Sequence, residues 1–145
     1  MADDTAELPF KAMDRWLGDG GMAVIGAIGG SFTAYRPEWC EGTWVPTALA
    51  CNPHGILQAG VHGIVLDAAM NFAVNAGLKG KDRTRATIQM SSEYLRGGEA
   101  GQQLRFTGRV TRMTKQIAFA EAEITDAGGA VLSRATGTFL LHRPG

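Results

Sequence analysis

The sequence predicts an α+β fold in which one antiparallel β-sheet wraps around one long central helix. Two observations support this. Residues 60–77 would be apolar on nearly every side of a helix, and four stretches after residue 85 alternate as strands joined by short turns do. A sheet is the only predicted element long enough to cover such a helix. The 145 residues amount to about one domain, so we expect a single domain over 1–145.

The region before residue 50 is expected to hold one helix and two strands. Residues 31–35 and 43–49 are β-prone and lie next to prolines, which favours edge strands or strand ends. An additional N-terminal amphipathic helix is predicted over residues 5–17, ended by the glycines of 18–21. Its apolar residues recur close to the 3.6-residue period: Leu8, Phe10, Met13, Trp16 and Leu17.

The rest of the chain is expected to form the long helix and four further strands. Gly77 is a suitable end for the helix of residues 60–77. A charged loop follows, and then the strands, which we place at 86–95, 103–113, 117–125 and 130–141. Turn-forming residues separate them at 97–98, 115–116 and 126–129, and such short links favour antiparallel neighbours.

Charge and cysteine content narrow the class of protein. Fourteen Lys and Arg balance fourteen Asp and Glu, so the net charge is zero, and neither a nucleic-acid partner nor a membrane partner is expected. Two cysteines without C-x-x-C spacing do not form a disulfide framework. Without a signal-like start or a run of about 18 apolar residues, a cytoplasmic protein is expected.

One carboxylate stands out in the long helix. From Gly42 to Leu78 the only Asp, Glu, Lys or Arg is Asp67, at the middle of the apolar segment. A buried carboxylate is costly unless it is hydrogen-bonded or used, although an Asp that reaches the surface or caps a neighbouring element would also fit. The loop 52–60 leads into the helix, whose N-terminal amides suit a carbonyl oxygen that gains negative charge.

These residues resemble a known signature. The sequence Asn52-Pro-His-Gly-Ile-Leu-Gln58-Ala59-Gly60, with Asp67 nine residues after Gln58, is similar to the motif of hotdog-fold acyl-CoA thioesterases of the phenylacetate-pathway (PaaI-like) type. The stretches 87–96, 126–129 and 135–139 also resemble the later strands of that family. The resemblance covers residues 45–141, the motif-bearing core, and hardly includes residues 1–40.

The resemblance implies roles for individual residues. Asp67 matches the general base or nucleophile, Asn52 and Thr87 match side chains that position the water, and the Ala59 amide would polarise the thioester carbonyl. Gln58 stands where the family often has His, and it can donate a hydrogen bond but cannot take up a proton. We further expect Gly60, Arg96 and Lys115 to contact the substrate, the last two through CoA phosphates, although solvated basic residues beside turns are an equal alternative.

The spacing of the helix indicates a site shared between subunits. Ala59 and Asp67 are eight residues apart, which is about 12 Å along a helix. One thioester cannot touch both in a single chain, so the helix N-terminus of one subunit would meet the Asp of another. The resemblance implies the same arrangement, in dimers or tetramers.

The leading hypothesis is a homo-oligomeric thioesterase that hydrolyses a small or medium acyl-CoA, aromatic ones included, without a cofactor. Gln58 and Ala59 in place of the usual His-Gly keep a non-catalytic acyl-CoA binding or sensing domain as the main alternative. A dehydratase is weaker, since its His and acid arrangement is missing. No metal site is expected, because Cys51, His54 and His62 lack a fourth ligand at a usual spacing.

Overall fold

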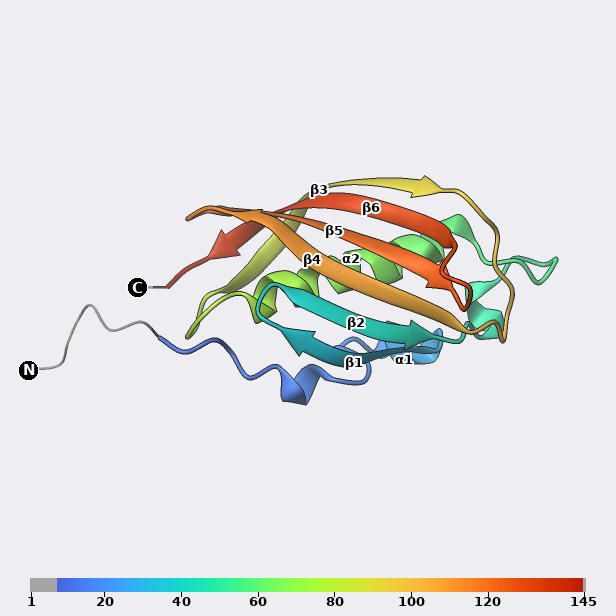
Figure 1. Ribbon diagram of the computed structural model, residues 1–145, viewed down its shortest axis with the longest axis horizontal. Coiled ribbons are helices and arrows are strands. Elements are labelled where there is room, and N and C mark those ends of the chain that lie inside the picture. Colours follow the sequence, from blue (N-terminus) through green and yellow to red (C-terminus); the bar gives the residue numbers. More distant parts are fainter. Residues whose placement is uncertain (1–7, 145) are drawn as a thin grey trace, which may run out of the picture.

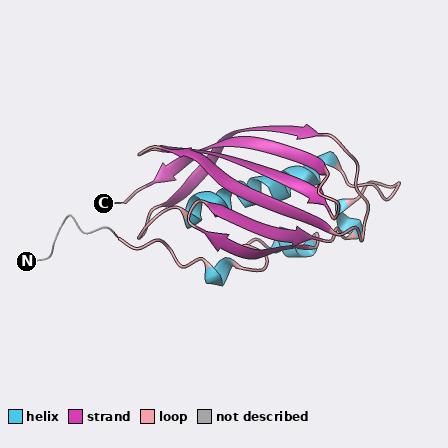
Figure 2. Cartoon of the chain, viewed as in Figure 1, coloured by secondary structure: helices cyan, strands magenta, loops and turns pink. Residues whose placement is uncertain are grey.

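The computed structural model describes residues 8–144, which form one sheet curved around one long helix (Figures 1 and 2). The sheet has six strands in the order β1-β2-β4-β5-β6-β3, and every neighbouring pair is antiparallel. This is the predicted α+β hotdog fold. The strands are β1 Gly30–Arg36, β2 Trp39–Trp44, β3 Arg83–Tyr94, β4 Leu104–Met113, β5 Ile117–Asp126 and β6 Val131–His142. The helices are α1 Ala23–Ala27 and α2 Ala59–Ala76, with short 3₁₀ turns at Asp14–Trp16 and Ala48–Ala50.

The long helix α2 is buried because small residues let the sheet approach it closely. Ala69 and Ala73 are fully buried, and a Cβ placed on Gly108 of β4 would lie 2.4 Å from the Ala69 carbonyl oxygen. The Sγ of Cys40 on β2 donates to the same carbonyl at 3.1 Å. Burial raises the pKa of the Cys40 thiol to about 12, so this cysteine is an inert core residue at neutral pH.

The N-terminal helix lies elsewhere than the spacing predicts. An additional helix is present as α1, but from residue 8 to residue 17 the only helical segment is the turn Asp14–Trp16; residues 5–7 of the prediction lie outside the described residues. The backbone amide of Lys11 donates to the Leu78 carbonyl, and that of Met13 donates to the Tyr35 hydroxyl. Met13 and Trp16 therefore pack against the core without a helix over residues 8–17, whereas Leu8, Phe10 and Leu17 stay exposed. The 3.6-residue spacing alone does not distinguish such a segment from a helix.

The β3 edge of the sheet is exposed. Nearly every residue of the twelve-residue edge strand β3 is exposed or half-buried, and Ile88 keeps 53% of its surface accessible. The β3–β6 register shifts between Thr87 and Gln89, which makes Ile88 the extra residue of a bulge. An exposed edge with an apolar residue at its centre is a template for pairing with another strand.

Among residues 8–144, no helix combines the length and apolar character that crossing a bilayer demands.

Candidate active site

Asp67 lies halfway along α2 and faces β3. Its carboxylate is held by Thr87 of β3 and by Asn71 of α2 itself. The Thr87 hydroxyl donates to Asp67 Oδ1 at 2.9 Å, and the Asn71 side-chain amide donates to the same oxygen at 3.2 Å. Asn71 also contacts Thr87 Oγ1 at 3.5 Å. Asp67 Oδ1 therefore accepts two hydrogen bonds, one from each partner. Two of the five predicted catalytic residues, Asp67 and Thr87, are therefore brought together here.

The sheet register explains why Thr87 reaches the helix. Thr87 pairs with the fully buried Phe139 of β6, so its side chain stands on the face of the sheet that covers α2. Register shifts on both sides of it, between Thr84 and Ala86 and between Thr87 and Gln89, mark bulges. Bulges re-aim side chains locally, and here they flank the residue that contacts the carboxylate.

The N-terminus of α2 is the second half of the predicted site. Ala59 and Gly60 are exposed in the first turn, where a helix offers amides without intrahelical acceptors. Among the described atoms, no acceptor receives the Ala59 or Gly60 amide. A Cβ on Gly60 would meet nothing within 4 Å. The helix start therefore presents free donors to an open surface.

Gln58 and Asn52 shape the approach to these amides. Gln58 is the N-cap residue of α2, and its side chain makes no cap hydrogen bond, which leaves it available to a ligand. Asn52 Oδ1 accepts the backbone amides of His54 and Ile56 at 2.9 and 3.2 Å. Asn52 thus organises the loop, and only its side-chain NH₂ remains to meet a substrate. Its role in positioning water stays a prediction.

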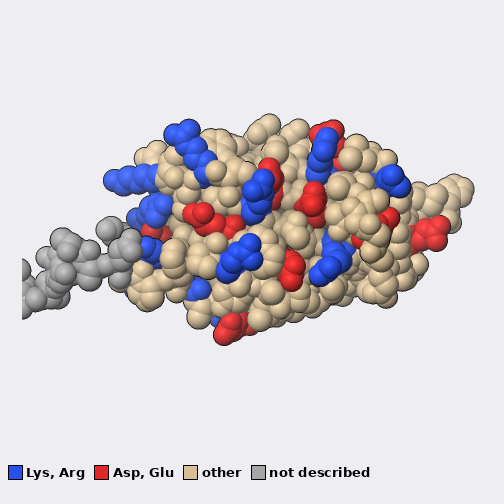
Figure 3. Space-filling view, in the orientation of Figure 1, with Lys and Arg blue, Asp and Glu red and all other residues tan. Residues whose placement is uncertain are grey.

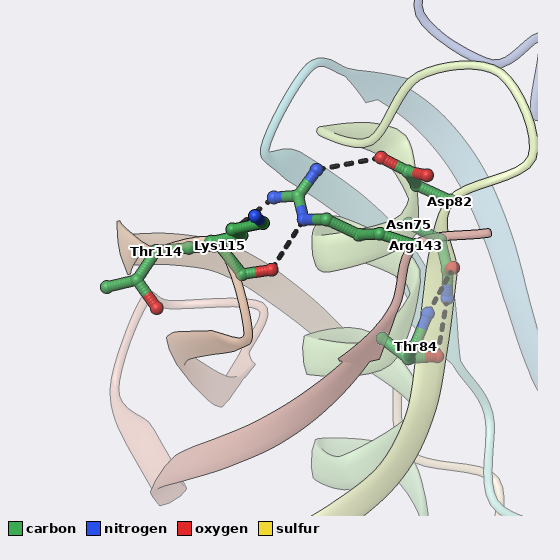
Figure 4. Close-up of polar contacts among 6 residues, drawn as sticks. All are labelled: Asn75, Asp82, Thr84, Thr114, Lys115 and Arg143. Carbon is green, nitrogen blue, oxygen red and sulfur yellow. Dashed lines mark hydrogen bonds and ion pairs between the residues drawn. The ribbon is translucent and has the colours of Figure 1, made fainter. Parts of the chain in front are cut away.

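The two predicted phosphate contacts lie far apart in one chain. Arg96 follows β3, and its backbone amide donates to the Leu132 carbonyl. Two residues later the Gly98 carbonyl accepts from the amide of Leu57, which precedes α2, so Arg96 lies near the α2 N-terminus. Lys115 lies in the β4–β5 turn, and its carbonyl oxygen accepts a hydrogen bond from Arg143 (Figure 4). Arg143 follows β6 and lies near Arg83, at the other end of β3 from Arg96. The twelve-residue strand between them spans roughly 35 Å. Arg96 and Lys115 of one subunit therefore cannot bind the same phosphate group.

Asn71 is a site residue that the sequence reasoning missed. It lies one turn after Asp67 on the same face of α2, and its amide also contacts the Asp67 carbonyl oxygen at 3.2 Å. The signal was available, since side chains at i and i+4 of a helix are neighbours and an Asn–Asp pair is a natural hydrogen bond.

His62 is buried between α2 and β6. It is 2% exposed, and its Nδ1 shares a hydrogen bond of 2.8 Å with the fully buried Ser133 hydroxyl of β6. The rings of Trp44 and Tyr94 meet it edge-on at 5.7 and 5.6 Å between centroids. The pair ties the first turns of α2 to the sheet, so it braces the helix N-terminus.

Burial of His62 predicts a loss of stability in acid. Desolvation lowers the pKa of His62 in the folded protein, so the unfolded chain takes up this proton first. The stabilisation is complete above the unfolded pKa of about 6.5 and declines as pH falls below it, by at most about 1.4 kcal/mol per pH unit. Urea unfolding at pH 7.0 and 5.5 measures this, and the decline is expected to shrink in His62→Gln, which keeps a hydrogen-bonding side chain. An equal decline in both proteins would contradict the assignment.

The chain is similar to known proteins in sequence and in fold. The thioesterase superfamily model matches residues 54–133, more than half of the chain. A phenylacetic acid degradation-related protein from Ralstonia eutropha JMP134 is 28% identical, with TM-score 0.73, and the match covers 81% of this chain and 89% of that one. The E. coli PaaI protein of the phenylacetic acid degradation operon is 25% identical, with TM-score 0.71 and 86% of each chain covered.

A more distant structure shows the same fold. A hypothetical thioesterase from Streptococcus pneumoniae TIGR4, solved with coenzyme A, is 20% identical, with TM-score 0.69 over 78% of this chain and 85% of that one. A search of curated proteins gave no match. The family match spans the α2 N-terminus, Asp67 and Thr87, and on this ground the chain belongs to the thioesterase superfamily, as a hotdog protein of the PaaI-like type.

Proposed function

We propose that this protein hydrolyses a small or medium acyl-CoA thioester to the free acid and CoA. The observation that carries the proposal is the Asp67 carboxylate, which accepts hydrogen bonds from Thr87 and Asn71 halfway along a helix that has no other Asp, Glu, Lys or Arg. Membership of the thioesterase superfamily supports the reaction class, and the pneumococcal structure with coenzyme A supports the CoA part of the substrate.

The chemistry needs one base or nucleophile and one set of oxyanion donors. Asp67 either takes a proton from the attacking water or attacks the thioester carbon itself. In the first route water adds to the acyl carbon, the C–S bond breaks, and the CoA sulfur leaves as a thiol with the proton that Asp67 took up. In the second route the C–S bond breaks as an Asp67–acyl anhydride forms, and water then cleaves this anhydride to release the carboxylic acid and restore Asp67. The Ala59 amide, aided by the Gln58 side chain, would stabilise the oxyanion at the start of α2. Water completes the reaction, so no cofactor is required.

The two halves would come from different subunits. Ala59 and Asp67 are separated by about 12 Å along the same rigid helix, too far for one carbonyl group to reach both. Pairing of β3 with β3 of a second copy would cover the exposed edge and bring two α2 helices to one face of a continuous sheet. We therefore propose a homodimeric unit with two shared sites, in a dimer or a tetramer.

The direct test is an acyl-CoA panel with detection of the released thiol. The panel should hold short, medium and aromatic acyl groups, and turnover of at least one is expected. Binding of acyl-CoA without release of thiol from any member would instead favour a non-catalytic binding domain.

Gly60→Ala separates the stability of α2 from its function. Replacing a helical glycine whose Cβ meets nothing should raise the free energy of unfolding by about 0.5–1 kcal/mol. The same methyl group would stand where the thioester approaches the first-turn amides, so kcat/KM should fall about tenfold or more. Chemical denaturation and steady-state kinetics measure the two effects.

Gly63→Ala is the matched control for Gly60→Ala. Gly63 is another helical glycine in α2, and its added Cβ would make only an ordinary contact of 3.5 Å with the Tyr94 hydroxyl. It should be stabilised to a similar degree without the kinetic loss. If Gly60→Ala is as active as the wild type, the thioester does not approach the first turn of α2.

A further inference from the structure

A groove of about 370 Å³ lies on the side of α2 turned toward the N-terminal segment. One wall is the segment 11–22, the opposite wall is the start of β3, and the floor is α2 itself. A neighbouring recess, lined by Lys11, Arg15, Arg83 and also Lys81, continues from it. Of the residues that the proposed hydrolysis uses, only Asn71 lines this groove.

The groove is cationic although the chain is neutral overall. Lys11, Arg15 and Arg83 line it, and none of the described residues that line it is acidic. The ion pairs found among residues 8–144 use Arg109, Arg134 and Arg143 and none of these three cations. Figure 3 shows Lys and Arg side chains gathered at the end of the molecule that holds the C-terminus, whereas both signs alternate over the middle of the sheet.

The burial of Lys11 shows that its charge is under-compensated. Desolvation is the main cause that lowers the pKa of the Lys11 amine, and the neighbouring Asp82 only partly offsets it. Asp82 itself is engaged by Arg143 at 2.8 Å (Figure 4). An anion entering the groove would therefore meet a partly buried cation that is close to Asp82 but makes no ion pair among residues 8–144.

The apolar residues that line the groove are largely aromatic. Phe32 and Phe72 lie stacked with ring centroids 4.4 Å apart, and both line the groove together with the buried Met13. Trp16, over which Arg15 lies at 4.7 Å, forms the edge. The groove thus suits a ligand with a hydrocarbon body and a negative end.

The groove begins at the reacting carboxylate. Asn71 lines it and also donates to Asp67. Asn75 lines it one turn further on and holds Thr84 by two hydrogen bonds, of 3.0 and 3.1 Å (Figure 4). These bonds hold the start of β3, whose first residue is Arg83, against α2. Asn71 and Asn75 lie four and eight residues beyond Asp67, so the groove covers about 6–12 Å from the site along α2.

We propose, resting on the proposed function, that this groove holds the far end of the acyl group and that the preferred acyl group is dicarboxylic. The hydrocarbon chain lies over Phe72 and Phe32, and its terminal carboxylate meets Lys11, Arg15 and Arg83. The phosphates of CoA are the other anions of the substrate, but the pantetheine arm separates them from the thioester by more than this groove allows. The carboxylate is therefore the better fit.

Calorimetric binding of non-hydrolysable pantetheine thioethers tests the proposal without catalysis and without phosphates. We expect S-(5-carboxypentyl)pantetheine to bind the wild type at least tenfold more tightly than S-hexylpantetheine. Lys11→Met and Arg83→Gln should each reduce this preference several-fold, and Lys11→Arg should retain it. Arg105→Gln, which removes an exposed arginine from β4, is the matched control and should leave the preference intact.

The outcomes separate this proposal from the proposed function. Equal affinity for the two thioethers, or no binding of either, would overturn the dicarboxylic assignment even if acyl-CoA is hydrolysed. A loss in Lys11→Met that appears only with S-hexyl-CoA would assign the cations to CoA phosphates and overturn it too. The predicted preference in a protein that hydrolyses no thioester would support the groove and contradict the hydrolase.

Discussion

Asp67→Asn is expected to lower kcat/KM for the best acyl-CoA by about 10²- to 10⁴-fold, the range that a general base contributes. Asn has the same shape and can still accept from Thr87 at the same oxygen, so the hydrogen bond of 2.9 Å need not be lost. It cannot take up a proton or act as a nucleophile, so the loss should appear in kcat more than in KM. Thiol release under steady-state conditions measures it.

Two controls make the Asp67 result interpretable. Glu123→Gln removes one exposed carboxylate from the outer face of β5 and should keep wild-type activity. Thr87→Val removes the donor but leaves the base, so it should be impaired less than Asp67→Asn. Undiminished turnover in Asp67→Asn, with an unchanged thermal midpoint, would refute the role of Asp67.

Ile88→Lys is expected to convert the protein to a monomer of 15.4 kDa and to remove most of its activity. Ile88 is 53% exposed at the centre of the β3 edge, where a second β3 strand would bring two lysines together across the two-fold axis. Like charges at a strand pair are destabilising, and each isolated chain would hold only one half of the site. Light scattering coupled to chromatography measures the mass.

Thr33→Lys supplies a matched control on the opposite edge. Thr33 is exposed on β1 and is likewise the residue at which the strand register shifts. The same charge there should leave mass and turnover unchanged. A wild type that is active as a 15.4 kDa monomer would overturn the shared site, whatever Ile88→Lys does.

Hydrophobic periodicity was sufficient for the core of the fold but not for its N-terminal part. The prediction for residues 60–77 lies within one residue of α2, because an 18-residue apolar segment has few alternatives. Residues 43–49 were placed too late, since the strand β2 is Trp39–Trp44 and a 3₁₀ turn follows. A helix over residues 5–17 is wrong for residues 8–17, because Met13 and Trp16 reach the core at helix-like spacing around the single 3₁₀ turn Asp14–Trp16.

The part of the site that lies in the family motif was predictable from the sequence. Asp67 and Thr87 were found through the resemblance, and the structure shows them in contact, whereas Asn71 was overlooked at i+4. The contact of His62 with Ser133 spans 71 positions along the chain, so only the folded sheet reveals it. Arg96 and Lys115 are both basic residues beside turns, but the sequence does not show that these turns lie at opposite ends of the twelve-residue strand β3.

The N-terminal segment is attached to the rest of the chain by few backbone bonds, such as Lys11 to Leu78 and the pair between Gly18 and Phe32. It supplies Lys11 and Arg15 to the groove, whereas Asp67 and the α2 amides belong to the sheet-wrapped helix. Two of the three cations of the groove are thereby encoded in a different stretch of the gene from Asp67 and the α2 amides. Recombination that exchanges the first 22 codons among related chains would alter which acids are released while the hydrolytic machinery is inherited intact.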